Sequence, residues 1–197
     1  MARTRREENE SLSNSIILLR HAETSINPSL PAHEWSITTD GIKKTRELAR
    51  SEIFTKIDGI IHSSERKARQ TAEVFAEGLR VDLYEIPEFD EVHRPTGPPL
   101  SNNEYRLRVR ETLTNWGRGP PGWESGAQAL RRFSEALKRI NIMFYDKNIL
   151  VVSHGIILVL YFSQLRNLQS IAFERWTQMP FLAWGLVRDA RVLIDII

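Results

Sequence analysis

The segment SIILLRHAET, residues 15–24, joins a run of large apolar side chains directly to an arginine and a histidine. Its apolar part, residues 15–19, does not alternate with polar residues, which predicts a strand buried on both faces of a parallel sheet. Two further runs of this kind occupy residues 58–61 and 148–152. We therefore expect three parallel strands at the centre of the fold.

A polar cluster that contains a histidine follows each of these predicted strands. The clusters are Arg20-His21, His62-Ser63-Ser64 and Ser153-His154. In open α/β sheets, ligands bind at the carboxyl ends of the parallel strands. The three clusters are therefore expected at one edge of the sheet, where a site can form.

Helices are predicted between and after the strands. Helical periodicity covers residues 39–52, 65–77, 102–116 and 125–145, and Gly78 is expected at a left-handed position that closes the second helix. This alternation of strands and helices predicts an α/β fold, a three-layer α/β/α sandwich with a mostly parallel central sheet.

Three more strands are expected beside the central ones. A short strand is predicted over residues 81–85. Near the end of the chain, residues 181–187 and 191–197 have the composition of two strands joined at Asp189-Ala190. They predict a C-terminal antiparallel hairpin.

The size and composition fit one globular domain. The chain has 197 residues, of which 41% are hydrophobic and 26% charged. Residues 15–197 are expected to form a single domain, preceded by a loose polar tail in residues 1–14. The apolar stretches, such as residues 156–162, are much shorter than the ~20 residues that cross a bilayer. We expect no membrane association and a cytoplasmic location.

Charge and cysteine content limit the partners. Lys and Arg number 27 and Asp and Glu 25, a formal charge of +2 that is too balanced to predict nucleic-acid binding. The chain has no cysteine, which excludes disulfides and thiolate zinc sites and suits a reducing cytosol. A small molecule is the expected partner, and a homodimer is compatible with this composition.

Arg20, His21 and His154 offer groups that phosphoryl transfer to a histidine needs. Such a nucleophile requires a neutral ring nitrogen, cations around the phosphate oxygens and an acid for the leaving oxygen. The planar fork of an arginine can hold two phosphate oxygens, and Gly155 after His154 allows close approach. The histidines lack the i, i+4 spacing of a helical zinc site, so we expect neither a metal nor a cofactor.

Five segments of the chain form a series of motifs in a fixed order. They are RHAET at 20–24 followed by Asn27, ITTDG at 37–41, Ser63-Ser64 leading to ARQTAE at 68–73, Glu124-Ser125 with Arg132, and VSHG at 152–155. In this series the chain resembles the histidine phosphatase superfamily, also called the phosphoglycerate mutase-like family, over residues 15 to about 165. The opening RHGETxxN of that family and its late second histidine are both matched closely.

The resemblance implies a role for each matched residue. His21 would be the nucleophile, and Arg20 and His154 would bind the phosphate in a pocket that Thr24 and Asn27 help to line. The family's proton donor is a glutamate after the third strand. Glu91 fits its spacing better than Glu88 does, and it would protonate the leaving oxygen and then activate water.

Two positions depart from the family pattern. The second pocket arginine falls on Lys67, with Arg66 one residue earlier; we favour Lys67, because the register with Ala68-Arg69-Gln70-Thr71-Ala72 is unbroken. A lysine supplies charge without the bidentate fork. Ala22 replaces a glycine, and we expect the added methyl group to be tolerated.

The leading functional prediction is a metal-independent phosphomonoester hydrolase that acts through a phosphohistidine. Its substrate would be a small phosphorylated metabolite or a phosphorylated side chain. One alternative is a phosphoglycerate mutase-type transferase; the short region at residues 94–123 favours hydrolysis, because family mutases carry a longer basic insertion. The other alternative is a non-catalytic protein that binds a phosphorylated ligand. This alternative stays open because Lys67 stands where the family has an arginine.

Overall fold

The computed structural model describes residues 13–95 and 100–197. One six-stranded sheet runs through it, in the order β3-β2-β4-β1-β5-β6. Its strands are β1 (Ser15–Arg20), β2 (Gly59–His62), β3 (Leu83–Glu85), β4 (Asn148–Ser153), β5 (Trp184–Arg188) and β6 (Arg191–Ile194). The first four of the order are parallel, while β5 is antiparallel to β1 and β6 to β5. The mostly parallel sheet and the C-terminal hairpin are confirmed.

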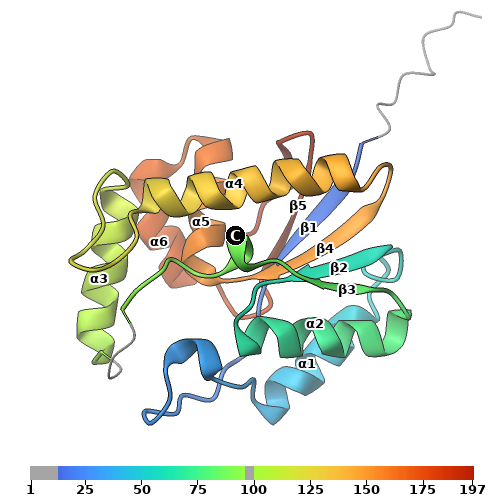
Figure 1. The fold of residues 1–197 in the computed structure, drawn as a ribbon, viewed down its shortest axis with the longest axis horizontal. Coiled ribbons are helices and arrows are strands. Elements are labelled where there is room, and N and C mark those ends of the chain that lie inside the picture. Colours follow the sequence, from blue (N-terminus) through green and yellow to red (C-terminus); the bar gives the residue numbers. More distant parts are fainter. Residues whose placement is uncertain (1–12, 96–99) are drawn as a thin grey trace, which may run out of the picture.

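Helices cover both faces of the sheet (Figure 1). They are α1 (Thr39–Ala49), α2 (Arg66–Leu79), α3 (Asn102–Thr114), α4 (Gly126–Met143), α5 (Gly155–Arg166) and α6 (Ala172–Gln178). Helices α1 and α2 lie on one face, and α4 and α5 on the other, with α3 and α6 beside them (Figure 1). The three-layer α/β/α prediction is therefore confirmed.

Strand β1 shows why the apolar runs do not alternate. Ile17 and Leu19 belong to the hydrophobic cluster beneath α2, whereas Ile16 and Leu18 belong to the larger cluster beneath α4 and α5. Successive side chains of a strand point to opposite faces, so both sets must be apolar when both faces are covered. All four side chains are 3% exposed or less.

Helix α5 has no counterpart among the predicted helices. Every residue from Gly155 to Ser163 is buried. A helix that is apolar all round carries no amphipathic period, so the pattern of residues 156–162 did not reveal it. Among the described residues, no helix combines the length and the apolar character that a membrane span requires.

The prediction of a left-handed position at Gly78 was wrong. Helix α2 continues through Gly78, and the left-handed residue after it is Arg80, with φ of 53°. An isolated glycine costs a helix only about 1 kcal/mol, so tertiary packing can carry the helix past it.

Residues 1–12 of the predicted N-terminal tail lie outside the described residues. The last residue of that tail, Asn14, is buried. Its side chain donates to the carbonyl of Asn141 (3.3 Å) and accepts from the amide of Lys147 (2.9 Å).

Candidate active site

The carboxyl ends of β1 and β4 bring His21 and His154 together. The two strands pair in register, with Arg20 opposite Ser153, and the amide of His21 donates to the carbonyl of Ser153 (2.9 Å). The ring centroids of the two histidines lie 5.1 Å apart, and both side chains are buried. Residues separated by more than a hundred positions thus form the centre of one site.

The backbone sets the tautomer of His21. Its Nδ1 lies 2.8 Å from the carbonyl oxygen of Ala22, which can only accept, so Nδ1 carries the proton and Nε2 keeps its lone pair. The hydroxyl of Thr24 lies 3.3 Å from the same Nδ1. Burial, followed by the charges of His154, Lys67 and Arg20, lowers the pKa of His21 well below its ordinary value. The ring therefore stays neutral, as a nucleophile must.

Two contacts hold the guanidinium of Arg20. Its Nη1 donates to the carbonyl of Met179, and its guanidinium lies 4.4 Å over the ring of Phe181. The guanidinium also packs against Gly155, where a Cβ atom would lie at an ordinary contact distance of 3.4 Å from Cζ of Arg20. The Nε of Arg20 is buried and has no hydrogen-bond partner among the described residues. A donor of this charged group is thus available to an anion.

Lys67, and not Arg66, reaches this site. Lys67 is buried, and its ammonium group donates to the carbonyl of Ala32 (2.9 Å) and to the carboxylate of Glu65. Its charge contributes to lowering the pKa of both histidines, after the effect of burial. Arg66 is exposed on the first turn of α2. The sequence register that favoured Lys67 agrees with this placement.

We expect Lys67→Ala to lower kcat/KM for a phosphate ester by about 100-fold, because the pocket then loses a buried cation near the reacting phosphate. Arg66→Ala is the matched control on the adjacent helical position, and its kcat/KM should stay within about threefold of the unmodified protein, as for an exposed side chain. Steady-state kinetics of the two variants test this. A larger loss in Arg66→Ala than in Lys67→Ala would contradict the assignment.

Ser63 contacts His154. This serine belongs to one of the five motifs, but the sequence analysis gave it no role. The Oγ of Ser63 lies 2.6 Å from Nε2 of His154. Burial is the main cause that lowers the pKa of His154, to about 3, so this ring too is neutral at physiological pH. Ser63 directly follows β2, which lies next to β4 in the sheet. Ser63 therefore lies near His154 because both follow the carboxyl ends of neighbouring parallel strands, where sites form in open α/β sheets.

Glu91 is buried at the amino terminus of α5. Its Oε2 accepts from the amide of Ile156 (2.9 Å), and its Oε1 accepts from the amides of Ile157 (3.0 Å) and Val92 (3.0 Å). Burial raises the pKa of this carboxyl group and outweighs these hydrogen bonds. The competing candidate, Glu88, pairs instead with Arg139 on the outer side of α4. The structure brings Glu91 into the site and leaves Glu88 outside it.

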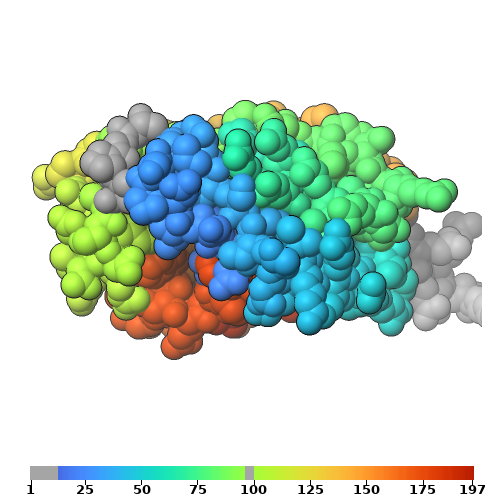
Figure 2. Space-filling view, turned by 90° about the horizontal axis from the view of Figure 1, so that it is seen from below, coloured from blue at the N-terminus to red at the C-terminus, as the bar shows by residue number. Residues whose placement is uncertain are grey.

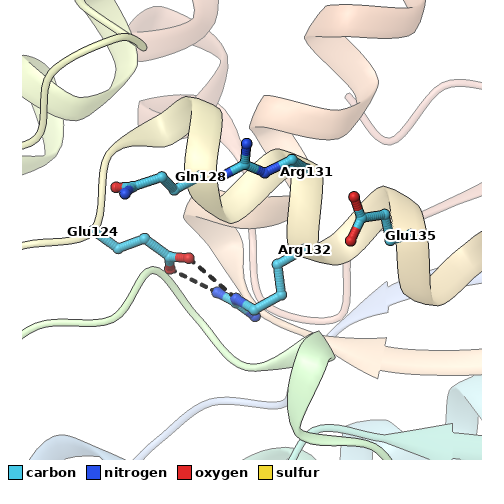
Figure 3. A pocket seen from close by; sticks show the side chains of 5 residues that line it. All are labelled: Glu124, Gln128, Arg131, Arg132 and Glu135. Carbon is cyan, nitrogen blue, oxygen red and sulfur yellow. Dashed lines mark hydrogen bonds and ion pairs between the residues drawn. The ribbon is translucent and has the colours of Figure 1, made fainter.

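An arginine of α4 holds the segment that carries Glu91. Arg132 donates to the carbonyls of Glu88 (2.7 Å), Asp90 (3.2 Å) and Glu91 (3.3 Å). It also pairs with Glu124 (Figure 3), and Glu124 accepts from the amide of His93, on the other side of Glu91 along the chain. A surface pocket of about 430 Å³ lies here, lined by Glu124, Gln128, Arg131, Arg132 and Glu135. The late motif of Glu124-Ser125 with Arg132 thus positions the acidic segment.

We expect Arg132→Leu to lower kcat by about tenfold or more while the inhibition constant of inorganic phosphate changes little, because a small displacement of Glu91 affects the reaction more than it affects anion binding. Arg131→Leu, which changes the exposed neighbour in the same pocket, is the control. A purely structural role of Arg132 would lower the melting temperature and leave the kcat of the folded fraction unchanged, and that result would contradict the prediction.

Arg94 and Tyr105 belong to the site although no motif indicated them. The Cζ of Arg94 lies 5.2 Å from the ring centroid of Tyr105 and 5.7 Å from that of Trp123. Its Nη1 is buried without a hydrogen-bond partner among the described residues. The charge of Arg94 acts on the pKa of both Glu91 and His154, behind stronger causes. These side chains come from a loop and from α3, and neither position lies in one of the five motifs.

Asn27 makes its hydrogen bonds within its own loop. It is exposed, its Oδ1 accepts from the amide of Ser29 (3.0 Å), and its carbonyl accepts from the indole of Trp35 (2.9 Å). These contacts order the loop before the short helix η1 (Ala32–Glu34). Figure 2 shows this blue segment on one face of the molecule, between α3 and the pair α1 and α2. That Asn27 lines the pocket therefore stays a prediction.

Ala22 fits its position without strain. It is fully buried, and its φ is not positive, so the backbone does not require the glycine of the family pattern. Within residues 13–95 and 100–197, no three His, Asp or Glu side chains form a group able to hold a metal ion. The site therefore consists of polar protein groups. They are two neutral histidines, three cations and two carboxyl groups: His21, His154, Arg20, Lys67, Arg94, Glu65 and Glu91.

The fold and the site define a family. The model of the histidine phosphatase superfamily (branch 1) matches residues 16–185. The chain belongs to this superfamily, which confirms the resemblance seen in the motifs. Because the match covers both histidines, His21 and His154, it includes the whole candidate site.

The relatives of this chain include named phosphatases. It is 26% identical over 156 residues to the adenosylcobalamin/alpha-ribazole phosphatase of Salmonella typhimurium, covering 75% of this chain and 77% of the relative. It is 23% identical over 144 residues to an uncharacterized phosphatase, PhoE, of Bacillus subtilis, covering 72% of each. Among solved structures, YhfR of Bacillus stearothermophilus superposes with a TM-score of 0.74 at 18% identity, over 92% of this chain and 95% of the other.

A further solved relative contains a phosphorylated ligand. A mutant of the phosphoserine phosphatase of Entamoeba histolytica, in complex with phosphoserine, superposes with a TM-score of 0.72 at 20% identity. The match covers 92% of this chain and 94% of that one. At this level of identity the likeness shows a common fold.

Proposed function

We propose that the protein is a metal-independent phosphomonoester hydrolase that forms a covalent phosphohistidine at His21. The observation that carries the proposal is the fixed tautomer of His21: with Nδ1 bound to the carbonyl of Ala22, the lone pair of Nε2 is available for attack. Arg20 and Lys67 supply the cations that a phosphoryl group in transfer needs.

The reaction takes two steps. Nε2 of His21 attacks phosphorus, the bond from phosphorus to the ester oxygen breaks, and Glu91 gives its proton to that oxygen, so that an alcohol leaves. The ionised Glu91 then takes a proton from a water molecule, whose oxygen attacks phosphorus while the bond from phosphorus to Nε2 breaks, so that phosphate and neutral His21 are released. The raised pKa of Glu91 suits this role, because burial favours the protonated form that the first step consumes.

The substrate is proposed to be a small phosphate ester or a phosphorylated side chain. Support comes from relatives named as phosphatases of alpha-ribazole and of phosphoserine. The aromatic side chains of Tyr105, Trp123 and Phe181 lie close to the cations Arg94 and Arg20, which gives the site mouth both charge and apolar surface. Such a lining suits an organic phosphate better than free phosphate alone.

The experiment is to measure phosphate release from para-nitrophenyl phosphate, phosphoserine and a panel of phosphorylated metabolites, with and without a chelator. The proposal predicts turnover that the chelator does not change. Interconversion of phosphoglycerates without release of phosphate would favour the mutase instead. Binding of phosphate esters without any turnover across the panel would favour the non-catalytic binder, and either result would overturn the proposal.

A further inference from the structure

A buried carboxylate, that of Glu65, lies among the cations of the site. Glu65 precedes α2, and its side chain is only 10% exposed. Its Oε2 accepts from the ammonium group of Lys67, and its Oε1 accepts from the amide of Glu91 (3.1 Å). The same Oε1 lies 3.6 Å from Nε2 of His154. A group that repels phosphate therefore stands where phosphate has to bind.

Glu65 stays ionised over the whole working pH range. Burial alone raises its pKa, but the nearby His154 and Lys67 outweigh burial and hold the pKa well below its ordinary range. The ionisable groups that face it from neighbouring elements are Lys67, His154, Glu91, Asp90 and Arg94. Because His154 is neutral at physiological pH, the charge that directly balances Glu65 is that of Lys67.

The carboxylate retains capacity to accept further hydrogen bonds. Two carboxylate oxygens offer about four lone-pair positions. The ammonium group of Lys67 and the amide of Glu91 use one on each oxygen. A phosphate oxygen without a proton has nothing to donate to the remaining positions and is repelled by the charge. A protonated phosphate oxygen can donate, and a charge-assisted O–H···O⁻ bond is among the stronger hydrogen bonds.

We propose that Glu65 is a specificity-determining residue that selects phosphate groups carrying one proton, by accepting a hydrogen bond from the protonated oxygen. The inference rests on the proposed phosphatase function and names the form of substrate that the same site takes. A phosphate monoester loses its second proton at about pH 6. The site is therefore matched to the singly charged ester, and its affinity for the phosphate group declines once that proton is lost.

The test compares two anions of similar shape, methylphosphonate and methanesulfonate, by isothermal titration of the unmodified protein and of Glu65→Gln. At about pH 5.5 the phosphonate still carries one proton, whereas the sulfonate carries none, and both have a single negative charge. The unmodified protein should bind the phosphonate at least about tenfold more tightly than the sulfonate, the scale of one hydrogen bond to a charged group. In Glu65→Gln the preference should fall below about threefold, mainly through tighter sulfonate binding, because the amide can donate to the sulfonate.

Two controls keep the test decisive. Glu73→Gln changes an exposed carboxylate on the same helix and should leave the preference unchanged. A titration of the unmodified protein between about pH 5 and pH 9 needs no variant: the ratio of phosphonate to sulfonate affinity should fall as the phosphonate loses its proton. Ionisation of Glu91 acts equally on the two anions while both carry a single charge, so it does not alter the ratio there.

The possible results distinguish a failure of the role of Glu65 from a failure of the proposed phosphatase function. Equal binding of the two anions by the unmodified protein, a ratio that does not change with pH, or an unchanged preference in Glu65→Gln would overturn the role of Glu65 while turnover of phosphate esters continues. Failure to bind either anion, together with absence of turnover, would overturn both the inference and the proposed function.

Discussion

His21→Asn is expected to lower turnover of phosphate esters by about 10⁴-fold or more, the scale found when a covalent nucleophile is removed. The reason is chemical: Nε2 of His21, whose lone pair the Ala22 contact leaves free, is the atom proposed to attack phosphorus. Asparagine keeps a polar side chain of similar size but has no ring nitrogen for attack. Burst and steady-state kinetics with para-nitrophenyl phosphate measure the loss.

The control for this variant is His33→Asn. His33 lies in η1 with about half of its side chain exposed, and its turnover should stay within about twofold of the unmodified protein, as for an exposed substitution. Circular dichroism checks that both variants are folded. Turnover above about one per cent of the unmodified rate in folded His21→Asn would contradict the role of His21 as the nucleophile.

Glu91→Gln is expected to slow the hydrolysis of alkyl phosphates by about 10²- to 10³-fold, and that of para-nitrophenyl phosphate by about threefold or less. An alkoxide needs a proton as it leaves, whereas para-nitrophenolate leaves without one. The raised pKa of Glu91 also sets the direction of the pH profile: in the unmodified protein, kcat for alkyl esters falls as pH rises through that pKa, because the ionised group has no proton to give. In Glu91→Gln this fall disappears.

Glu88→Gln is the matched control for this prediction, because Glu88 was the competing candidate and pairs with Arg139 outside the site. It should leave both ester classes within about twofold. Glu91 also accepts three backbone amides at the start of α5, so Glu91→Gln needs its melting temperature measured alongside. Equal loss on alkyl and aryl esters would count against Glu91 as the acid.

Much of the fold follows from patterns that report on burial. The three apolar runs correspond to β1, β2 and β4. They could be recognised because a strand covered on both faces is apolar at successive positions. The hairpin turn at Asp189-Ala190 was predicted correctly, and both residues have the positive φ of a two-residue turn. Helix α5 was missed for a related reason, since burial on every side removes the helical period.

The strand ends and the motif register predicted residues that the structure brings together at the ends of β1 and β4. The motif register favoured Lys67 over Arg66, and of the two Lys67 is the buried one. Glu65 and Arg94 were not found, because their burial and their contacts depend on side-chain packing that one sequence does not reveal. Asn27 shows the reverse case, a motif residue whose contacts lie within its own loop.

The measurement that tests the central claim most directly is the location of the phosphoryl group on the protein during turnover. The protein would be mixed with a phosphate ester, quenched in alkali, and digested for mass spectrometry. The account predicts an acid-labile, base-stable phosphoryl group on the peptide that contains His21, and its absence in His21→Asn. Turnover without any phosphohistidine, or a phosphoryl group on another residue, would contradict it.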